Sequence, residues 1–167
     1  LMSWALSCLS LRKNYDDVSF YTDSNGYKVL IKLLKLPYTD VVVQYDDLSC
    51  PDIHWAYPKI FTYSLQKEPF IHVDGDIHLP CRLDASIESG ALIAQNIEMG
   101  TQYYKNMMND LLRRDYRMPE FLHKVLERDV IPSYNAGFLG GNDLDFIQEY
   151  CRIAFQFIDD NGLLDFH

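Results

Sequence analysis

The alternation of short β-type runs with helical segments constrains the fold of this chain more than any other feature. Strand-type runs occur at residues 18–22, 41–43, 70–73, 91–94 and 134–139. Helical spacing of apolar residues occurs at residues 2–13, 27–36, 51–66, 101–114, 119–128 and 142–157. Strands that alternate with helices of roughly 10–16 residues are typical of a mainly parallel sheet with helices on both faces. We therefore predict an α/β fold with a Rossmann-like sheet.

Three of these segments carry more specific expectations. An amphipathic helix over residues 2–13 is predicted by apolar side chains at helical spacing, namely Met2, Ala5, Leu6 and Leu9. The β-branched run Val41-Val42-Val43 predicts a buried strand. We expect Gly140-Gly141 to end the strand at residues 134–139.

The composition favours one packed domain that spans residues 1–167. Its 48% hydrophobic and 14% aromatic content suffices for a hydrophobic core and argues against disorder. The net charge of −9 argues against nucleic acid as a partner, because phosphate neutralisation needs clustered Lys and Arg. A nucleotide ligand is still compatible with this charge, since a bound cation reverses the local field.

Cysteine usage and hydropathy bear on location. The four cysteines are far apart, which is typical of reduced thiols in the cytosol rather than of a disulfide framework or zinc site. No stretch approaches the roughly 20 apolar residues of a membrane span. We expect a cytoplasmic protein without a transmembrane segment, and association with the membrane surface stays open. Because the chain opens directly in a helical pattern, we also expect residues to be missing at one or both ends.

Three groups of polar and small residues lie at predicted strand ends, namely Asp23-Ser24, Asp74-Gly75-Asp76 and Asn135-Ala136-Gly137. In open α/β sheets, ligands bind outside the carboxyl ends of the strands. We therefore expect these groups to contribute to one binding site. Two alternatives stay open: a plain helix N-cap for the first group, and a tight turn or bulge that needs small residues for the third.

The second group, which we call the D-G-D motif, suits a hard metal ion. Asp74 and Asp76 are two residues apart, so in an extended chain both carboxylates project to the same side. Gly75 leaves the backbone open to close approach by a ligand. Two converging carboxylates suit Mn²⁺ or Mg²⁺, with substrate phosphates completing the coordination shell.

A second D-x-D match, Asp143-Leu144-Asp145, shows that the bare motif is weak evidence. This copy lies at the start of a predicted helix, where carboxylates cap free N–H groups and stabilise the helix dipole. We therefore interpret it as structural. The D-G-D motif differs because it follows an apolar strand directly.

The stretch Phe70-Ile71-His72-Val73-Asp74-Gly75-Asp76-Ile77 resembles the strand and D-x-D signature of GT-A glycosyltransferases. The later stretch Tyr134-Asn135-Ala136-Gly137-Phe138-Leu139-Gly140-Gly141 is similar to the segment that follows this signature in galactosyl- and mannosyl-transferring members. We call Asn135-Ala136-Gly137 the N-A-G segment. The order and separation of the two stretches also match. The resemblance implies a GT-A sheet that here lacks its first strand.

The resemblance also implies residue roles. Asp74 and Asp76 bind the metal, Asp74 lies near the ribose, and the N-A-G segment lines the donor-sugar pocket. The full set of expected donor-binding residues is Asp23, Ser24, Lys59, Asp74, Gly75, Asp76, Asn135, Ala136 and Gly137. From the residues themselves, the small side chains permit close backbone approach, and the Asn135 amide is suited to sugar hydroxyls. No catalytic base is evident.

Other candidates have plainer alternatives. In similar enzymes a basic residue at the place of Lys59 points toward the diphosphate, but a solvated helix face is the simpler interpretation. Ligand or acid–base roles stay open for the histidines His54, His72, His78 and His123, although a histidine among apolar strand residues is more often a packed or surface residue. His78 is the strongest of them, because it lies two residues after Asp76. Glu98 is a candidate polar contact near the acceptor.

These observations favour a metal-dependent glycosyltransferase. It would transfer a sugar from a nucleotide-sugar donor to a carbohydrate or glycolipid acceptor. The alternative is a non-catalytic nucleotide-, metal- or partner-binding domain derived from such an enzyme. A phosphate-cleaving metalloenzyme would need a second acidic cluster and a phosphate-binding loop, and neither is evident.

Overall fold

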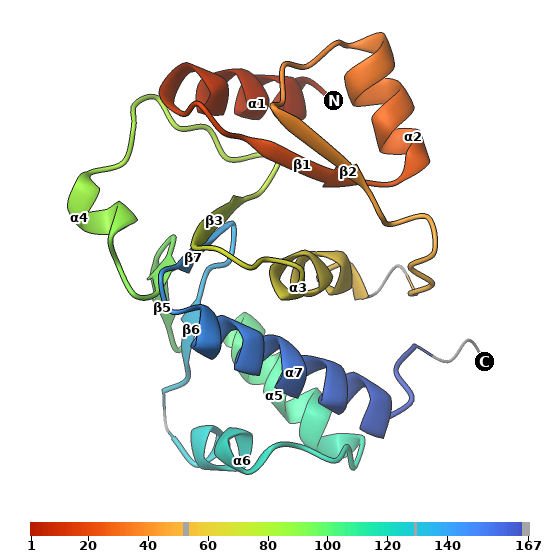
Figure 1. Cartoon of the computed structure of the whole chain (residues 1–167). Coiled ribbons are helices and arrows are strands. Elements are labelled where there is room, and N and C mark those ends of the chain that lie inside the picture. The colour runs from red at the N-terminus through yellow and green to blue at the C-terminus, as the bar shows by residue number, and fades with distance from the viewer. Residues whose placement is uncertain (52–53, 129, 165–167) are drawn as a thin grey trace.

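The computed structural model describes residues 1–51, 54–128 and 130–164, and it shows a mixed α/β fold (Figure 1). In chain order, the elements are α1 (Met2–Asn14), β1 (Ser19–Thr22), α2 (Ser24–Gly26), the π-helical η1 (Tyr27–Leu33), β2 (Asp40–Val43), α3 (Tyr57–Ser64), β3 (Phe70–Val73), α4 (Ala85–Glu88), β4 (Ile93–Ala94), β5 (Ile97–Met99), α5 (Gln102–Arg113), α6 (Glu120–Leu126), β6 (Pro132–Tyr134), β7 (Phe138–Gly141) and α7 (Leu144–Asp160). The mixed α/β class is therefore confirmed.

The strands form three small sheets. β1 pairs with β2 in parallel, β7 lies between β3 and β4 with antiparallel pairing on both sides, and β5 pairs with β6 antiparallel. Within the described residues, the pairing is thus mostly antiparallel, and the predicted mainly parallel sheet with helices on both faces is not confirmed. Short apolar strands carry no local mark of their pairing direction, so this feature depends on contacts distant in sequence.

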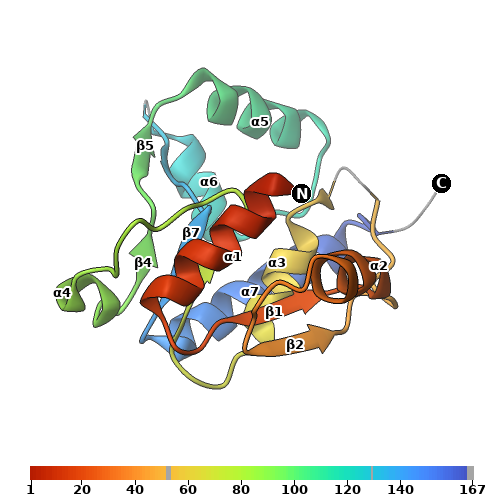
Figure 2. The same cartoon turned by 90° about the horizontal axis from the view of Figure 1, so that it is seen from above.

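The first core holds α1, η1 and the β1–β2 pair together. Its buried side chains are Cys8, Phe20, Leu30 and Leu36. Phe20 stacks on Tyr38 with ring centroids 4.6 Å apart. Viewed from above, α1 lies to one side of η1, with β1 and β2 beneath them (Figure 2). In the run Val41-Val42-Val43, the first two residues are half-buried and Val43 is exposed, so the expected burial is not found, because β2 pairs on one side only among the described strands.

The second core lies between α3 and α7 and supports β3. Tyr63, Ile147 and Cys151 are almost fully buried there, and Phe70 and Leu139 pack against them. The strand ends with Gly140-Gly141 as expected, but both glycines are part of β7 and pair with β3 instead of following the last strand residue. A Cβ at Gly140 would lie 2.0 Å from the Phe70 carbonyl oxygen, so the close approach of the two strands requires glycine.

Helix α1 turns a polar stripe, not its apolar stripe, toward the D-G-D loop. The helix predicted over residues 2–13 is present as α1, but Met2, Leu6 and Leu9 are 87%, 54% and 54% exposed, and only Ala5 of its four expected apolar residues packs against the core. Four polar side chains at helical spacing instead hydrogen-bond with the backbone at residues 74–79, namely Ser3, Ser7, Ser10 and Asn14. The loop backbone needs such partners because it belongs to no sheet.

Several element boundaries also differ from expectation. The helix predicted over residues 51–66 is α3 and begins at Tyr57, and positions 52 and 53 lie outside the described residues. The run at residues 134–139 divides into the end of β6, the N-A-G segment and the start of β7. Neither α4 nor β5 was predicted. Across the part of the chain that the structure describes, no helix has the length and apolarity needed to cross a membrane.

Candidate functional site

The D-G-D motif and the N-A-G segment lie side by side. β3 ends at Val73, which pairs with Phe138 at the start of β7. The backbone N–H of Asp74 donates to the carbonyl of Gly137 at 2.8 Å. The two motifs therefore meet, but not at the carboxyl ends of parallel strands as expected. Antiparallel pairing places the amino end of β7 beside the carboxyl end of β3.

Lys59 from α3 joins these two motifs. Its Nζ lies 2.8 Å from both carboxylate oxygens of Asp74 and donates to the carbonyl of Ala136 at 3.3 Å. The Lys59 side chain is only 17% exposed, so the interpretation as a solvated helix face is wrong. An ammonium group held between a carboxylate and a carbonyl fixes a positive charge at this point.

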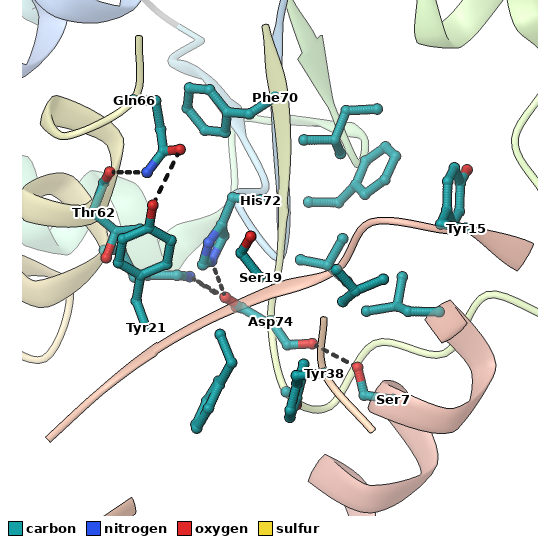
Figure 3. Close-up of a pocket in the computed structure, with 18 of the residues that line it drawn as sticks. Ser7, Tyr15, Ser19, Tyr21, Tyr38, Thr62, Gln66, Phe70, His72 and Asp74 are labelled. Carbon is teal, nitrogen blue, oxygen red and sulfur yellow. Dashed lines mark hydrogen bonds and ion pairs between the residues drawn. The ribbon is translucent and has the colours of Figure 1, made fainter. Parts of the chain in front are cut away.

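His72 is the site residue that the sequence interpretation underrated. Its Nε2 lies 3.0 Å from Asp74 Oδ1, and its ring meets the edge of Tyr63 at a centroid distance of 5.1 Å. Figure 3 shows the imidazole pointing toward the Asp74 carboxylate. The signal was present in the sequence, because His72 and Asp74 are two residues apart on an extended strand. The same two-residue spacing had instead favoured Asp76 and His78.

The charge of Asp74 is set by opposing effects. Burial alone would raise the pKa of this carboxyl, but hydrogen bonds from His72 and Lys59 and the Lys59 charge outweigh it and hold the pKa below its usual range. Asp74 is therefore an anion at neutral pH, with two cationic or hydrogen-bonding partners already in place.

The rest of the D-G-D motif is more open. Asp76 is exposed, whereas Gly75 packs against α1. A Cβ at Gly75 would lie 2.4 Å from the Trp4 ring, and Ser3 Oγ donates to the Gly75 carbonyl at 3.1 Å. The glycine expected to admit a ligand is therefore required, at least on this side, by contact with the Trp4 indole.

Asp74 and Asp76 fit Mn²⁺ or Mg²⁺ in ligand type, since both supply hard carboxylate oxygens. Among the described residues, however, no group of three or more His, Cys, Asp or Glu side chains could hold a metal ion. Asp74 is also already paired with Lys59. A metal held here would therefore need ligand oxygens from a substrate to complete its coordination.

The N-A-G segment is a turn stabilised by its own asparagine. Asn135 Oδ1 accepts from the Gly137 backbone N–H at 2.9 Å, and Asn135 Nδ2 donates to Glu98 Oε1 at 3.3 Å. Glu98 thus lies beside the segment, and its expected contact near the acceptor stays a prediction. Both ends of the Asn135 amide are in use, and one N–H of Nδ2 is left for a ligand.

The first predicted group has a structural role. Asp23 caps the helix that follows β1, since its Oδ1 accepts from the Gly26 backbone N–H at 2.6 Å. Ser24 donates to Asp46 through both its backbone N–H and its hydroxyl, and these hydrogen bonds hold the pKa of Asp46 below its usual range. His78 is exposed.

The second D-x-D match behaves as predicted. Asp143 is the N-cap of α7, and its Oδ1 accepts from the Phe146 backbone N–H at 3.0 Å. Asp145 lies exposed in the first turn of the same helix. This match therefore has a structural explanation, in contrast to the D-G-D motif.

An open cavity of about 1140 Å³ lies between the α1–β1 side and the α3–β3 side and borders the D-G-D motif. Figure 3 shows Tyr21, Thr62 and His72 around its interior. The lining residues that bear on the site are Asp23, Trp55, Lys59, His72, Asp74, Gly75 and Asp76. The cavity thus joins the end of β1 to the end of β3, and it gives the charged centre access to solvent.

A family model described as a family of unknown function (DUF6734) matches residues 1–164. The chain therefore belongs to this family. Comparisons with curated proteins and with solved structures gave no match. The assignment of function thus depends on the site itself.

Proposed function

We propose that this chain is the nucleotide-sugar-binding domain of a metal-dependent glycosyltransferase. One observation carries the proposal: Lys59 contacts both Asp74 of the D-G-D motif and Ala136 of the N-A-G segment. These three residues are separated by up to 77 positions and meet at one ammonium group. Unrelated turns would have no reason to converge in this way at an open cavity.

The charge arrangement supports an anionic ligand at this centre. Lys59 supplies a fixed cation, and a diphosphate that entered the cavity would compete with Asp74 for it. When bound, Mn²⁺ or Mg²⁺ would be held by Asp76 and Asp74 and would neutralise charge on the departing diphosphate. In the proposed reaction, Lys59 binds and orients the same leaving group.

The β1–β2 pair supports the finer proposal of a GT-A domain. It is a parallel pair joined through α2 and η1, and Asp23 follows β1 at its carboxyl end. Parallel strands with a helical crossover are the unit that binds nucleotides in open α/β sheets. In this proposal, the nucleotide lies along the cavity from Asp23 toward Asp74, and the donor sugar points toward the N-A-G segment.

The acceptor side is proposed from Glu98. Its carboxylate is held by Asn135 on the edge of the N-A-G segment, at the place where an acceptor hydroxyl would approach the donor sugar. A carbohydrate or glycolipid hydroxyl is the acceptor that this polar edge suits best. The protein would then act at or near a membrane surface only if the acceptor is a glycolipid.

A second candidate function is a non-catalytic nucleotide-binding domain. The observation that favours it is the pairing of Asp74 with Lys59 and His72, which leaves one exposed carboxylate, Asp76, for a metal. Such a domain would bind the nucleotide without turnover. Product formation separates the two functions.

The direct test is release of nucleoside diphosphate from UDP- and GDP-hexoses in the presence of Mn²⁺, with and without oligosaccharide acceptors. We expect release from one donor, and we expect Asp76→Asn to lower the rate at least about 100-fold. Asp145→Asn is the matched control, because Asp145 belongs to the structural D-x-D match. Release that Asp76→Asn leaves unchanged, or that Asp145→Asn lowers equally, would contradict the assigned site.

A further inference from the structure

Trp55 is an exposed indole at the charged centre. It is 68% exposed and lines the same cavity as Asp74. Lys59 Nζ lies over its ring at 5.4 Å from the centroid, and this same atom lies 2.8 Å from the Asp74 carboxylate. The indole is therefore placed one side chain away from the proposed diphosphate position, with most of its surface open to solvent.

The other tryptophan of the chain has a different environment. Trp4 also lines the cavity, but its ring packs against Gly75 and meets Phe20 edge-on with centroids 5.7 Å apart. These packing contacts explain the position of the Trp4 side chain. Among the residues that the structure describes, no such aromatic packing involves Trp55, whose ring instead lies beside the cation of Lys59. A large aromatic surface beside polar groups in a cavity is the usual means of binding the ring of a ligand.

We propose that Trp55 is the platform on which the sugar ring of the donor stacks, an inference that rests on the proposed function. In a nucleotide sugar, the diphosphate joins the hexose at one end and the ribose at the other, and the base lies beyond the ribose. Because Lys59 also contacts Ala136 of the N-A-G segment, which is the proposed sugar pocket, the adjacent Trp55 ring is placed toward the hexose end of the diphosphate. The C–H groups on one face of a pyranose supply the apolar surface that an indole packs against.

Calorimetry with four ligands tests this proposal, namely UDP, UDP-galactose, GDP and GDP-mannose, all with Mn²⁺. For the donor whose base binds, Trp55→Ala is expected to weaken the nucleotide sugar about tenfold, or about 1.4 kcal/mol. The same variant should change the affinity for the nucleoside diphosphate less than about twofold. Trp55→Phe should retain most of the sugar affinity. Phe121→Ala on α6, which removes another exposed aromatic side chain, should change neither affinity.

Each alternative result is distinct. If Trp55→Ala leaves both affinities unchanged while the wild-type protein binds, the platform is disproved and the proposed function stands. Equal weakening of nucleotide and nucleotide sugar would show a contact with the base, which also overturns the sugar platform. Failure of the wild-type protein to bind any of the four ligands would overturn the proposed function together with the platform. Thermal unfolding of Trp55→Ala checks that the exposed substitution leaves the fold intact.

Discussion

The ammonium group of Lys59 lies 2.8 Å from both carboxylate oxygens of Asp74, with the two side chains 17% and 27% exposed. Because both side chains are partly buried, salt screens this ion pair less than it screens a fully exposed pair. It links α3 to the end of β3, and through the Ala136 carbonyl it also reaches the start of β7. The pair therefore has consequences for both stability and binding.

Lys59→Met should lower stability and ligand affinity together. The substitution keeps the length of the side chain but leaves Asp74 with His72 as its remaining side-chain partner. We expect the free energy of unfolding to fall by about 1–2 kcal/mol and nucleoside diphosphate affinity to fall at least about tenfold. Urea unfolding and calorimetry measure the two effects. Lys67→Met, at an exposed position, is the control and should change stability by less than about 0.5 kcal/mol.

The pH dependence of stability should carry a contribution from Asp74. Its folded-state pKa is lowered, net of burial, by His72 and Lys59, whereas the unfolded value is about 3.9. The stabilisation is therefore fully present above the unfolded pKa and is lost as the pH falls through the folded pKa. The difference in unfolding free energy between wild type and Asp74→Asn should shrink as the pH falls below about 4. A difference that does not shrink through this range would contradict the assigned pairing.

The polar stripe of α1 should hold the D-G-D loop in place. Asn14 Nδ2 donates to the carbonyl of Leu79 at 2.9 Å, so Asn14→Ala leaves that carbonyl without this partner. We expect a loss of about 1 kcal/mol in unfolding free energy and weaker nucleotide binding. Lys13→Ala alters the neighbouring exposed position of the same helix and should change neither quantity. Equal effects of both substitutions would point to a general effect on the helix.

Two glycines of the N-A-G region should respond differently to alanine. A Cβ at Gly140 meets the main chain of Phe70 at 2.0 Å, so Gly140→Ala forces β3 and β7 apart and should cost about 3 kcal/mol. A Cβ at Gly137 meets the end of the exposed Gln95 side chain at 2.5 Å, and that side chain can move away. Gly137→Ala should therefore cost less than about 1 kcal/mol while lowering donor-sugar affinity. Chemical unfolding of both variants checks this order.

The positions of the site residues were more predictable than the sheet that carries them. The run Phe70–Val73 marked a strand before the D-G-D motif, and small residues marked the N-A-G turn, because both signals are local. The antiparallel pairing of Val73 with Phe138 was not predictable from either run, since it depends on contacts 65 positions apart. Lys59 was identified only through a resemblance, and its ion pair needed the structure.

The helical spacing over residues 2–13 predicted α1 but not which stripe of the helix faces the protein. Its apolar and polar residues both recur at helical spacing, and burial of the apolar stripe is the usual outcome. Here the D-G-D loop presents backbone groups that need partners, so the stripe that includes Ser7 and Asn14 faces the loop. Met2 and Leu6 are left exposed. The neighbouring loop determines which stripe of α1 faces the protein, and the sequence of the helix alone does not contain this information.

The most direct test of the central claim is calorimetric titration of UDP and GDP with Mn²⁺ and with EDTA. Wild-type protein and an Asp74→Asn/Asp76→Asn double variant should be compared under identical conditions. We predict Mn²⁺-dependent binding of one nucleotide to the wild type and at least about 100-fold weaker binding to the double variant. Binding that does not depend on Mn²⁺ and persists in the double variant would contradict a nucleotide-sugar site at Lys59 and Asp74. The absence of binding by folded wild-type protein would contradict it as well.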